Sequence, residues 1–254
     1  MFKKTQSIKT QNRDNHNKFV RARNLERGDV HDKLRIALAE IYIEGKGIEI
    51  GALHKPLNIP EHKAEVKYVD RLSVADLNKQ YPEIGEPMVE PHYVDDGEKL
   101  KKIKNNSQDF VIACHFYEHC SNPLQTIQSL LRVVKKGGGI FLALPDKRYT
   151  FDIKRPITDF KHIVDDYEKG PSATKLQHFN EWVELVEGIN DKAKKKERVH
   201  ELIEMDYSIH YHVWDYDALC EHFGKAQTYF SNKFEICMIA RNLSENLVYI
   251  KKLK

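Results

Sequence analysis

The sequence predicts an α/β fold with a mostly parallel sheet, and three observations carry that prediction. Short apolar runs of strand length alternate with segments whose apolar residues recur at helical spacing. The run Ile48-Glu49-Ile50 is followed at once by Gly51, a pattern typical of a buried strand that turns sharply at its carboxyl end. Only a few residues separate the last two apolar runs, which favours a terminal antiparallel hairpin.

The composition excludes several classes of protein. Among the 254 residues, 41 Lys and Arg face 38 Asp and Glu, and a net charge of +3 is too balanced to predict a nucleic-acid partner. No apolar run approaches the roughly 20 residues of a membrane span, and the polar N-terminal region has no hydrophobic core of a secretory signal. The four cysteines form no C-x-x-C pair, so we expect reduced thiols and a cytoplasmic location.

The first half of the chain predicts a polar tail and then alternating elements. Residues 1–30 are polar, and we expect about the first 20 to be a mobile tail. A helix at 32–42 precedes the first strand, a second strand follows at 66–69, and a short helix at 74–80 ends before a proline. A short third strand at 91–94 ends in Asp95-Asp96-Gly97, with a helix expected to start at Glu98.

The fourth and fifth strands flank the most regular helix. Residues 109–114 are apolar almost throughout, as expected for a strand covered on both faces. Pro123 opens a helix whose apolar positions recur to 134, and we expect Lys135-Lys136 and the three following glycines to end it. The fifth strand is predicted at 140–144.

The alternation of predicted strands and helices then stops at a long polar insertion. Residues 146–212 are predicted to interrupt one α/β domain made of residues 31–145 and 213–254. Helical pieces are expected at 159–168 and 179–189, with the lysine run 192–196 as a solvated turn. A helix at 213–223 and antiparallel strands at 234–240 and 247–252 complete the chain.

Two acidic residues at predicted strand ends suggest an adenosine cofactor. Glu49 lies inside an apolar strand, where a carboxylate has little reason to sit unless it binds something. Asp70 ends the next strand 21 residues later, and an acid about 20 residues after such a glycine turn commonly bonds a ribose hydroxyl.

The segments EIGA, YVD, VDDGEKL, SQDFVIACHFYEH and LLRVVKKGGGIFLALPD resemble, in this order, the motifs of class I S-adenosylmethionine-dependent methyltransferases. The resemblance covers about residues 45–146 and implies a Rossmann-like sheet of seven strands whose last strand is antiparallel. The later segments PDKRYTFDIKRP, HFNEW and IHYHVW resemble a narrower bacterial subfamily, which implies surface-polysaccharide or small-molecule biosynthesis.

By matching position, the resemblance implies where the cofactor binds. Glu49 and Gly51 would frame its methionine end, Asp70 its ribose, and Asp95 or Asp96 its adenine amino group. The full expected set is Glu49, Gly51, Ala52, Asp70, Arg71, Asp95, Asp96, Cys114 and His115.

The loop after Gly51 departs from the family pattern. Ala52, Leu53 and His54 stand where the family has spaced glycines, which leaves open a protein that binds cofactor or a partner without catalysis. The absence of a G-x-G-x-x-G after the first strand also argues against a nicotinamide enzyme.

Methyl transfer to a hydroxyl or an amine requires a base, and histidine is the side chain whose pKa suits it. His115 is the first candidate, with packing against the cofactor as the alternative. His210 and His212 share a face if their segment is extended, so they are further candidates. Glu118 and His119 are predicted to be structural.

Polar residues after the fifth strand suggest an acceptor site. Arg148 and Arg155 can grip a carboxylate or phosphate through paired hydrogen bonds, although a solvated turn with Asp–Arg pairs is the alternative. The expected substrate-binding set is Asp146, Arg148, Tyr149, Arg155, His162 and His178.

The histidines of the insertion leave a metal site as a minor alternative. His162, His178, His210 and His212 could ligate a metal with Asp165, Asp166 or Glu181. No firm ligand spacing such as H-E-x-x-H is present, so the sequence assigns no metal.

The sequence therefore predicts transfer of a methyl group from S-adenosylmethionine to a small polar acceptor. A sugar, a nucleotide sugar or a phosphorylated metabolite is expected, methylated at oxygen. N-methylation of an amino sugar and a non-catalytic binding protein remain alternatives. The oligomeric state is not predicted.

Overall fold

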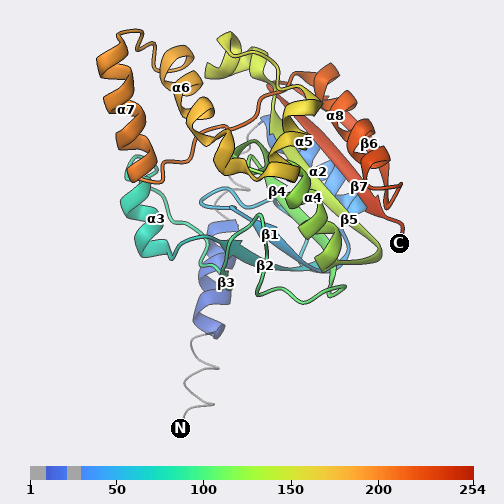
Figure 1. The fold of residues 1–254 in the computed structure, drawn as a ribbon. Helices are drawn as coiled ribbons and strands as arrows, with labels where there is room; N and C mark the ends of the chain where they lie inside the picture. The colour runs from blue at the N-terminus through green and yellow to red at the C-terminus, as the bar shows by residue number, and fades with distance from the viewer. Residues whose placement is uncertain (1–9, 22–29) are drawn as a thin grey trace.

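The computed structural model describes residues 10–21 and 30–254 (Figure 1). A seven-stranded sheet in the order β3-β2-β1-β4-β5-β7-β6 forms its centre. The strands are β1 (Gly45–Ile50), β2 (Ala64–Asp70), β3 (Tyr93–Val94), β4 (Gln108–Cys114), β5 (Val134–Pro145), β6 (Phe234–Asn242) and β7 (Glu245–Lys252). The strands from β3 to β5 are parallel, and β7 runs antiparallel to both β5 and β6. The predicted fold class is confirmed.

Helices cover both faces of this sheet (Figure 1). They are α2 (Val30–Tyr42), α3 (Val74–Gln80), α4 (Pro123–Val133), α5 (Phe160–Lys169), α6 (Lys175–Leu185), α7 (Lys192–Glu204) and α8 (Tyr216–Tyr229). The core between the sheet and α4, α5 and α8 is the larger one, and α2 packs on the opposite face.

β4 shows why the central strands are apolar throughout. Val111 and Ala113 belong to the core under α4 and α8, whereas Phe110 and Ile112 belong to the core under α2. Since successive side chains of a strand point to opposite faces, a strand covered on both sides must be apolar at every position.

Three of the predicted helices begin at side-chain caps. The side chain of Asn122 accepts a hydrogen bond from the backbone N–H of Gln125 at the start of α4. Asp159 and Asp215 do the same for α5 and α8. Each cap satisfies a backbone donor that the first helical turn leaves without a partner.

The insertion carries a small core of its own, away from the sheet. Phe179, Trp182 and Val183 of α6 pack against Val199 and Leu202 of α7. Figure 1 shows this helix pair beyond the carboxyl ends of the central strands, with α7 reaching toward α3. Arg71 at the end of β2 forms an ion pair of 3.0 Å with Asp206 just after α7, which ties the insertion to that edge.

The mobile tail expected for the first 20 residues is wrong where the structure describes it. Residues 10–21 are helical. Asn17 is 4% exposed, donates to the carbonyl oxygen of Glu90 and accepts from its N–H. Arg21 donates to the carbonyl oxygen of Ile59. Polar side chains that bond buried backbone groups thus dock this helix, and residues 1–9 and 22–29 lie outside the described part.

Three local expectations are also corrected. No helix starts at Glu98, because the carboxylate of Asp95 binds the N–H groups of Asp96 and Lys102 and folds residues 95–102 into turns. The run 135–139 belongs to β5, since pairing with β4 already begins at Val134. The lysine run 192–196 opens α7, whose cap is Asp191.

None of the helices in the described ranges is long and apolar enough to cross a bilayer.

Leu130 of α4 provides a test of the main core. Its side chain is fully buried, so Leu130→Ala removes apolar contacts and leaves a cavity. We expect a loss of about 2–5 kcal/mol in the free energy of unfolding, measured by denaturant titration. The exposed neighbour Gln128 is the control, and Gln128→Ala should change stability by less than about 0.5 kcal/mol. Equal effects of the two substitutions would contradict the assignment of this face.

Candidate active site

Two clefts meet at the carboxyl ends of the central parallel strands. Pairing places Ile50 of β1 opposite both Val69 of β2 and Ala113 of β4, so these three strands end at one level. The larger cleft, about 600 Å³, lies over the ends of β1, β2 and β4 and is covered by residues of the insertion. The smaller cleft, about 350 Å³, lies between α2, the loop after β1 and the β6–β7 turn. Gly51, Leu53 and His115 line both clefts.

Glu49 presents a buried carboxylate to the smaller cleft. The residue is 1% exposed, and its Oε1 accepts a hydrogen bond of 2.8 Å from the N–H of Leu57. Its Oε2 has no hydrogen-bond partner in the described part of the chain. Burial raises the pKa of this carboxyl group to about 8. A cationic or hydrogen-bond donor ligand would relieve this unsatisfied oxygen.

Gly51 leaves room for a ligand to approach the backbone. Its φ of 66° lies in the left-handed region, and a Cβ at this position would meet nothing closer than Phe116 at 4.0 Å. A side chain would therefore be strained in its backbone conformation and would project into open space. The space that the missing side chain leaves lies at the junction of the two clefts.

Asp70 lines the larger cleft at the end of β2. Its Oδ1 accepts only a long bond of 3.4 Å from the N–H of Leu72. Burial raises the pKa of its carboxyl group to about 6, although backbone hydrogen bonds from Leu72 and Arg71 oppose the rise. The carboxylate is partly desolvated and retains capacity to accept hydrogen bonds from a ligand.

The loop after β3 closes one end of the larger cleft. Asp96 and Gly97 line it, whereas Asp95 does not, because both its oxygens hold the loop's own backbone. Glu98 accepts hydrogen bonds from the N–H groups of Ser121 and Asn122 and so ties this loop to the start of α4. A Cβ on Gly97 would lie 2.7 Å from Phe116 and 2.8 Å from Ile50, so this wall has no room for a larger residue.

His115 stands at the junction of the two clefts. It follows β4 with a φ of 50°, an uncommon conformation for a residue other than glycine, and its side chain is 46% exposed. Its Nε2 lies 2.8 Å from Oε2 of Glu245, the first residue of β7. Glu245 is itself held by the guanidinium of Arg35 and by Asn242. These hydrogen bonds and the arginine outweigh burial and lower the pKa of Glu245 to about 2, so a carboxylate orients the imidazole.

A second carboxyl group lies on the other side of that imidazole. Oε1 of Glu118 is 3.6 Å from Nδ1 of His115. Glu118 is 1% exposed, and neither of its oxygens has a hydrogen-bond partner in the described residues. Burial raises the pKa of Glu118, while the neighbouring His115 and His210 oppose this rise. His115 therefore lies between two buried acidic groups, of which Glu245 is satisfied by hydrogen bonds and Glu118 is not.

The other two predicted catalytic histidines lie away from the clefts. His210 is 8% exposed, and its Nδ1 lies 2.6 Å from Asp152. His212 is fully buried, between the carbonyl oxygen of Cys120 and the carboxylate of Asp166. Neither residue lines the clefts formed by the described residues, so the expectation that they act as bases is not supported.

The predicted acceptor-binding residues do not converge. Arg155 is 2% exposed, and its guanidinium is taken up by Asp152, Glu181 and backbone carbonyl oxygens, so its proposed grip on an acceptor is corrected. Arg148 pairs with Asp146 through two hydrogen bonds of 2.9 and 2.6 Å, and Tyr149 is exposed. An acceptor role for Asp146, Arg148 and Tyr149 stays a prediction.

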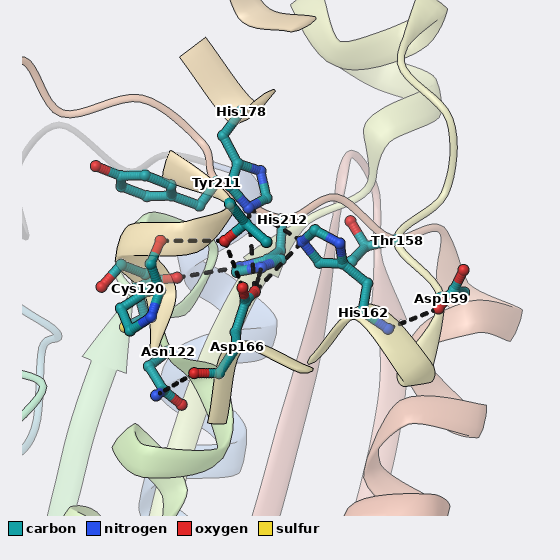
Figure 2. A network of polar contacts seen from close by, with 12 residues as sticks. Cys120, Asn122, Thr158, Asp159, His162, Asp166, His178, Tyr211 and His212 are labelled. Atoms are coloured by element: carbon teal, nitrogen blue, oxygen red, sulfur yellow. Dashed lines mark hydrogen bonds and ion pairs between the residues drawn. The ribbon is translucent and has the colours of Figure 1, made fainter. Parts of the chain in front are cut away.

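His162 and His178 instead meet His212 around Asp166, as Figure 2 shows. Burial lowers the pKa of His178 to about 3 and also lowers that of His212. Both imidazoles are therefore neutral near pH 7. This cluster lies behind the wall of the larger cleft. It contains His162 and His178, which the sequence assigned to acceptor binding.

Most of the expected cofactor residues do come together. Eight of the nine line one of the two clefts, and Asp95 is the exception. Sequence reasoning missed Phe116, Glu98, Tyr211, Arg35 and Glu245. Glu245 begins a strand 130 positions after His115, and no spacing rule connects residues so far apart.

Comparison with known proteins decides what this edge of the sheet is. Residues 50–142, from the last residue of β1 into β5, match the family model described as a methyltransferase domain. Over these residues the chain matches a methyltransferase domain. A search of curated proteins found no match to this chain.

Solved structures resemble this chain at low sequence identity. One named for zinc-dependent alcohol dehydrogenases from Rhodobacter sphaeroides is 14% identical, with 89% of this chain and 91% of that chain covered and a TM-score of 0.52. A SAM-dependent methyltransferase from Aquifex aeolicus is 12% identical, with 92% and 98% covered and a TM-score of 0.45. The CurJ carbon methyltransferase is 12% identical, with 84% and 49% covered and a TM-score of 0.44, so this chain spans about half its length. At these identities the likeness shows the fold alone.

The raised pKa of Asp70 predicts a pH dependence of cofactor binding. An ionised carboxylate accepts hydrogen bonds from hydroxyl groups better than a protonated one, so the contribution of Asp70 to affinity should be complete above about pH 6 and be lost below it. The fall should approach tenfold per pH unit for one titrating group. Calorimetric titration with S-adenosylmethionine from pH 5 to pH 8 measures it, and Asp70→Asn should bind weakly with a flatter profile. An unchanged affinity at pH 5 would contradict a role for this carboxylate.

Proposed function

We propose that this protein transfers a methyl group from S-adenosylmethionine to a hydroxyl oxygen of a small polar acceptor. The observation that carries the proposal is the position of His115, which lines both clefts and is oriented by Glu245. A base at that junction faces both the cofactor and an acceptor.

The unsatisfied groups of the site fit this cofactor. Glu49, with its unpartnered oxygen, would hold the amino group at the methionine end. Asp70 would accept from the ribose hydroxyls, and Asp96 stands at the adenine end of the larger cleft. The volume of about 600 Å³ suits a nucleoside-sized ligand.

The smaller cleft is the proposed acceptor site. Its lining includes Arg35, His54 and Lys55, together with Glu245 and Ser244. Such a polar lining fits a hydroxylated ligand, and Lys55 adds a positive charge that an anionic group of the ligand would meet. A sugar, a nucleotide sugar or a phosphorylated metabolite meets both requirements.

Bound S-adenosylmethionine supplies an electrophilic methyl group. The chain's own residues align the acceptor and remove its proton. With Nε2–H of His115 donating to Glu245, Nδ1 carries the lone pair that takes the proton of the acceptor hydroxyl. Glu245 and Glu118 flank the imidazolium that forms, and the charge of Glu245 stabilises it. The insertion, residues 146–212, would cover the cofactor through Lys175 and Tyr211.

Binding and turnover test the function in sequence. Calorimetric titration should show binding of S-adenosylmethionine and of its demethylated product, with NAD as the negative control. A panel of sugars, nucleotide sugars, phosphorylated metabolites and amino sugars is then assayed for methyl transfer. Methylation of amines alone would overturn the oxygen assignment, and cofactor binding without turnover on any acceptor would favour a binding protein.

His115→Gln provides the sharpest test of the proposed base. Glutamine keeps a polar side chain but cannot accept the proton, so kcat should fall by about 10²- to 10⁴-fold. The dissociation constant of the cofactor should change by less than about threefold, since loss of a base alone removes little ground-state binding. His62 is exposed in a turn before β2, and His62→Gln should leave both quantities unchanged. An unaltered kcat in His115→Gln would exclude the histidine as base.

A further inference from the structure

Four side chains of the insertion converge on one point outside the proposed active site (Figure 2). His162 and Asp166 lie one turn apart on α5, His178 lies on α6, and His212 lies in the segment before α8. Their ligand atoms all lie within 4.8 Å of one another. The three histidines face the centre with Nε2 wherever a contact is measured, and Asp166 faces it with Oδ2.

The separations between these atoms are those of a metal coordination shell. Nε2 of His162 is 3.1 Å from Nε2 of His178 and 3.3 Å from Oδ2 of Asp166. Oδ2 is also 2.9 Å from Nε2 of His212 and 4.0 Å from Nε2 of His178. Ligand atoms about 2.0–2.1 Å from a tetrahedral zinc ion are about 3.3 Å apart, which lies inside this range.

The hydrogen bonds of His212 require a positive charge at the centre. The carbonyl oxygen of Cys120 can only accept, so Nδ1 of His212 donates to it at 3.0 Å. A neutral imidazole carries one N–H, which leaves a lone pair on Nε2 facing a carboxylate oxygen at 2.9 Å. Two lone pairs this close repel each other unless a cation or an extra proton lies between them.

We propose that His162, Asp166, His178 and His212 form a zinc site. Three imidazoles and one carboxylate are ligands that suit zinc, and four ligands from the protein complete its tetrahedral shell. Four protein ligands leave no open coordination position, so the site is closed. The side chains of Asp166 and His212 have no solvent-exposed surface, and that of His162 is 21% exposed. A closed site without a position for water or substrate is structural rather than catalytic.

The residues around the ligands are arranged as a supporting shell. Thr174 donates from Oγ1 to Oδ1, the other oxygen of Asp166, which leaves Oδ2 to face the centre. The hydrogen bond from His212 to Cys120 fixes the tautomer that presents Nε2. Asn122 donates to the carbonyl oxygen of Asp166. Ligands oriented in this way are characteristic of metal sites in proteins.

Zinc at this point would hold three separate parts of the insertion together. Its ligands come from α5, from α6 and from the segment before α8. Tyr211, next to His212, lines the larger cleft and donates its N–H to the carbonyl oxygen of Glu118. Lys175 at the start of α6 also lines that cleft. The proposed metal thus supports the cover of the cleft, and it does not depend on the acceptor or on turnover.

Metal content of the full-length protein, purified without a histidine tag, is the decisive measurement. Mass spectrometry of the elements should find about one zinc ion per chain after dialysis, a stoichiometry that a closed four-ligand site requires. Removal by a chelator should lower the midpoint of thermal unfolding, and added zinc should restore it, because binding to the folded state stabilises it. A chain without stoichiometric zinc, whose midpoint does not respond to added zinc, would overturn the proposal and leave a hydrogen-bonded cluster with an extra proton.

Two ligand variants and two matched controls locate the metal. His162→Ala and Asp166→Asn should weaken zinc binding by at least about tenfold, the lower end of the loss seen even for supporting residues. Asp165→Asn changes the adjacent residue of α5, which pairs with Lys161 and Lys169, and should retain zinc. His200→Ala removes a histidine of α7 whose side chain is 73% exposed, and should also retain it. Equal zinc content in ligand and control variants would place the metal elsewhere and reject this site.

Cobalt substitution keeps the test independent of variant folding. Tetrahedral cobalt coordinated by nitrogen and oxygen ligands has a visible absorption band that octahedral cobalt in solution shows only weakly. The unmodified chain, stripped of zinc and loaded with cobalt, should show this band with an end point at one equivalent. The spectrum of hexahydrated cobalt at every ratio would contradict the site, as would a different metal bound in stoichiometric amounts in the purified protein.

Discussion

Charge buried at the carboxyl edge of the sheet is the constraint on which the rest of the site depends. Parallel pairing of β1, β2 and β4 brings Glu49, Asp70 and His115 to one level. Each carboxylate taken out of water there loses hydration that the protein restores only in part. Glu245 is the contrast, since Arg35, Asn242 and His115 together satisfy it. Glu49 and Asp70 can still accept hydrogen bonds, so they mark where a ligand would supply donors. Glu245 has its full set of partners and orients the imidazole of His115.

The insertion adds polar networks rather than a second sheet. Asp152 and Arg155 are almost fully buried, and each is bound on several sides by the segments that cross it. A buried charge with a complete set of partners fixes the position of those segments, because moving any one leaves an uncompensated ion. Arg155 therefore acts on the site through the backbone of residues 210 and 211, which carries Tyr211 into the cleft wall.

Much of the sheet and its edge could be predicted from the sequence for local reasons. The apolar runs of β1, β2 and β4 and the glycine after Ile50 act within a few residues, so their pattern alone indicates buried strands and a ligand at their ends. The family resemblance then predicted Asp70 and Asp96 as cofactor-binding residues, because their positions at strand ends match the family's motifs. The methyltransferase domain found by comparison agrees with that part.

The remainder depends on contacts that no local pattern contains. Arg35 lies on α2, His115 directly after β4 and Glu245 at the start of β7, and only the assembled sheet brings them together. The sequence suggested that Arg155 binds an anion, because arginine suits that role and charged and aromatic residues surround it in the chain. In the structure its side chain is buried and its guanidinium is held by protein partners, so it does not face a ligand. His162 and Asp166 are one helical turn apart, but their two histidine neighbours follow 12 and 46 positions after Asp166, through unrelated connections. The docked helix at 10–21 was missed because most of the side chains that hold it are polar, although Val20 packs with Ala52, Tyr68 and Val89.

At His115 the cost of a left-handed backbone conformation opposes the need for an imidazole at the proposed base. Residues other than glycine adopt a φ of 50° at a cost of order 1 kcal/mol, and β-branched residues adopt it least readily. Glycine would relax the backbone there but would leave no imidazole for Glu245 to orient. Stability and activity are therefore in conflict at this one position, so selection for thermal stability alone would favour loss of the histidine. Variants recovered from such a selection would need to be screened for turnover before this position was counted as improved.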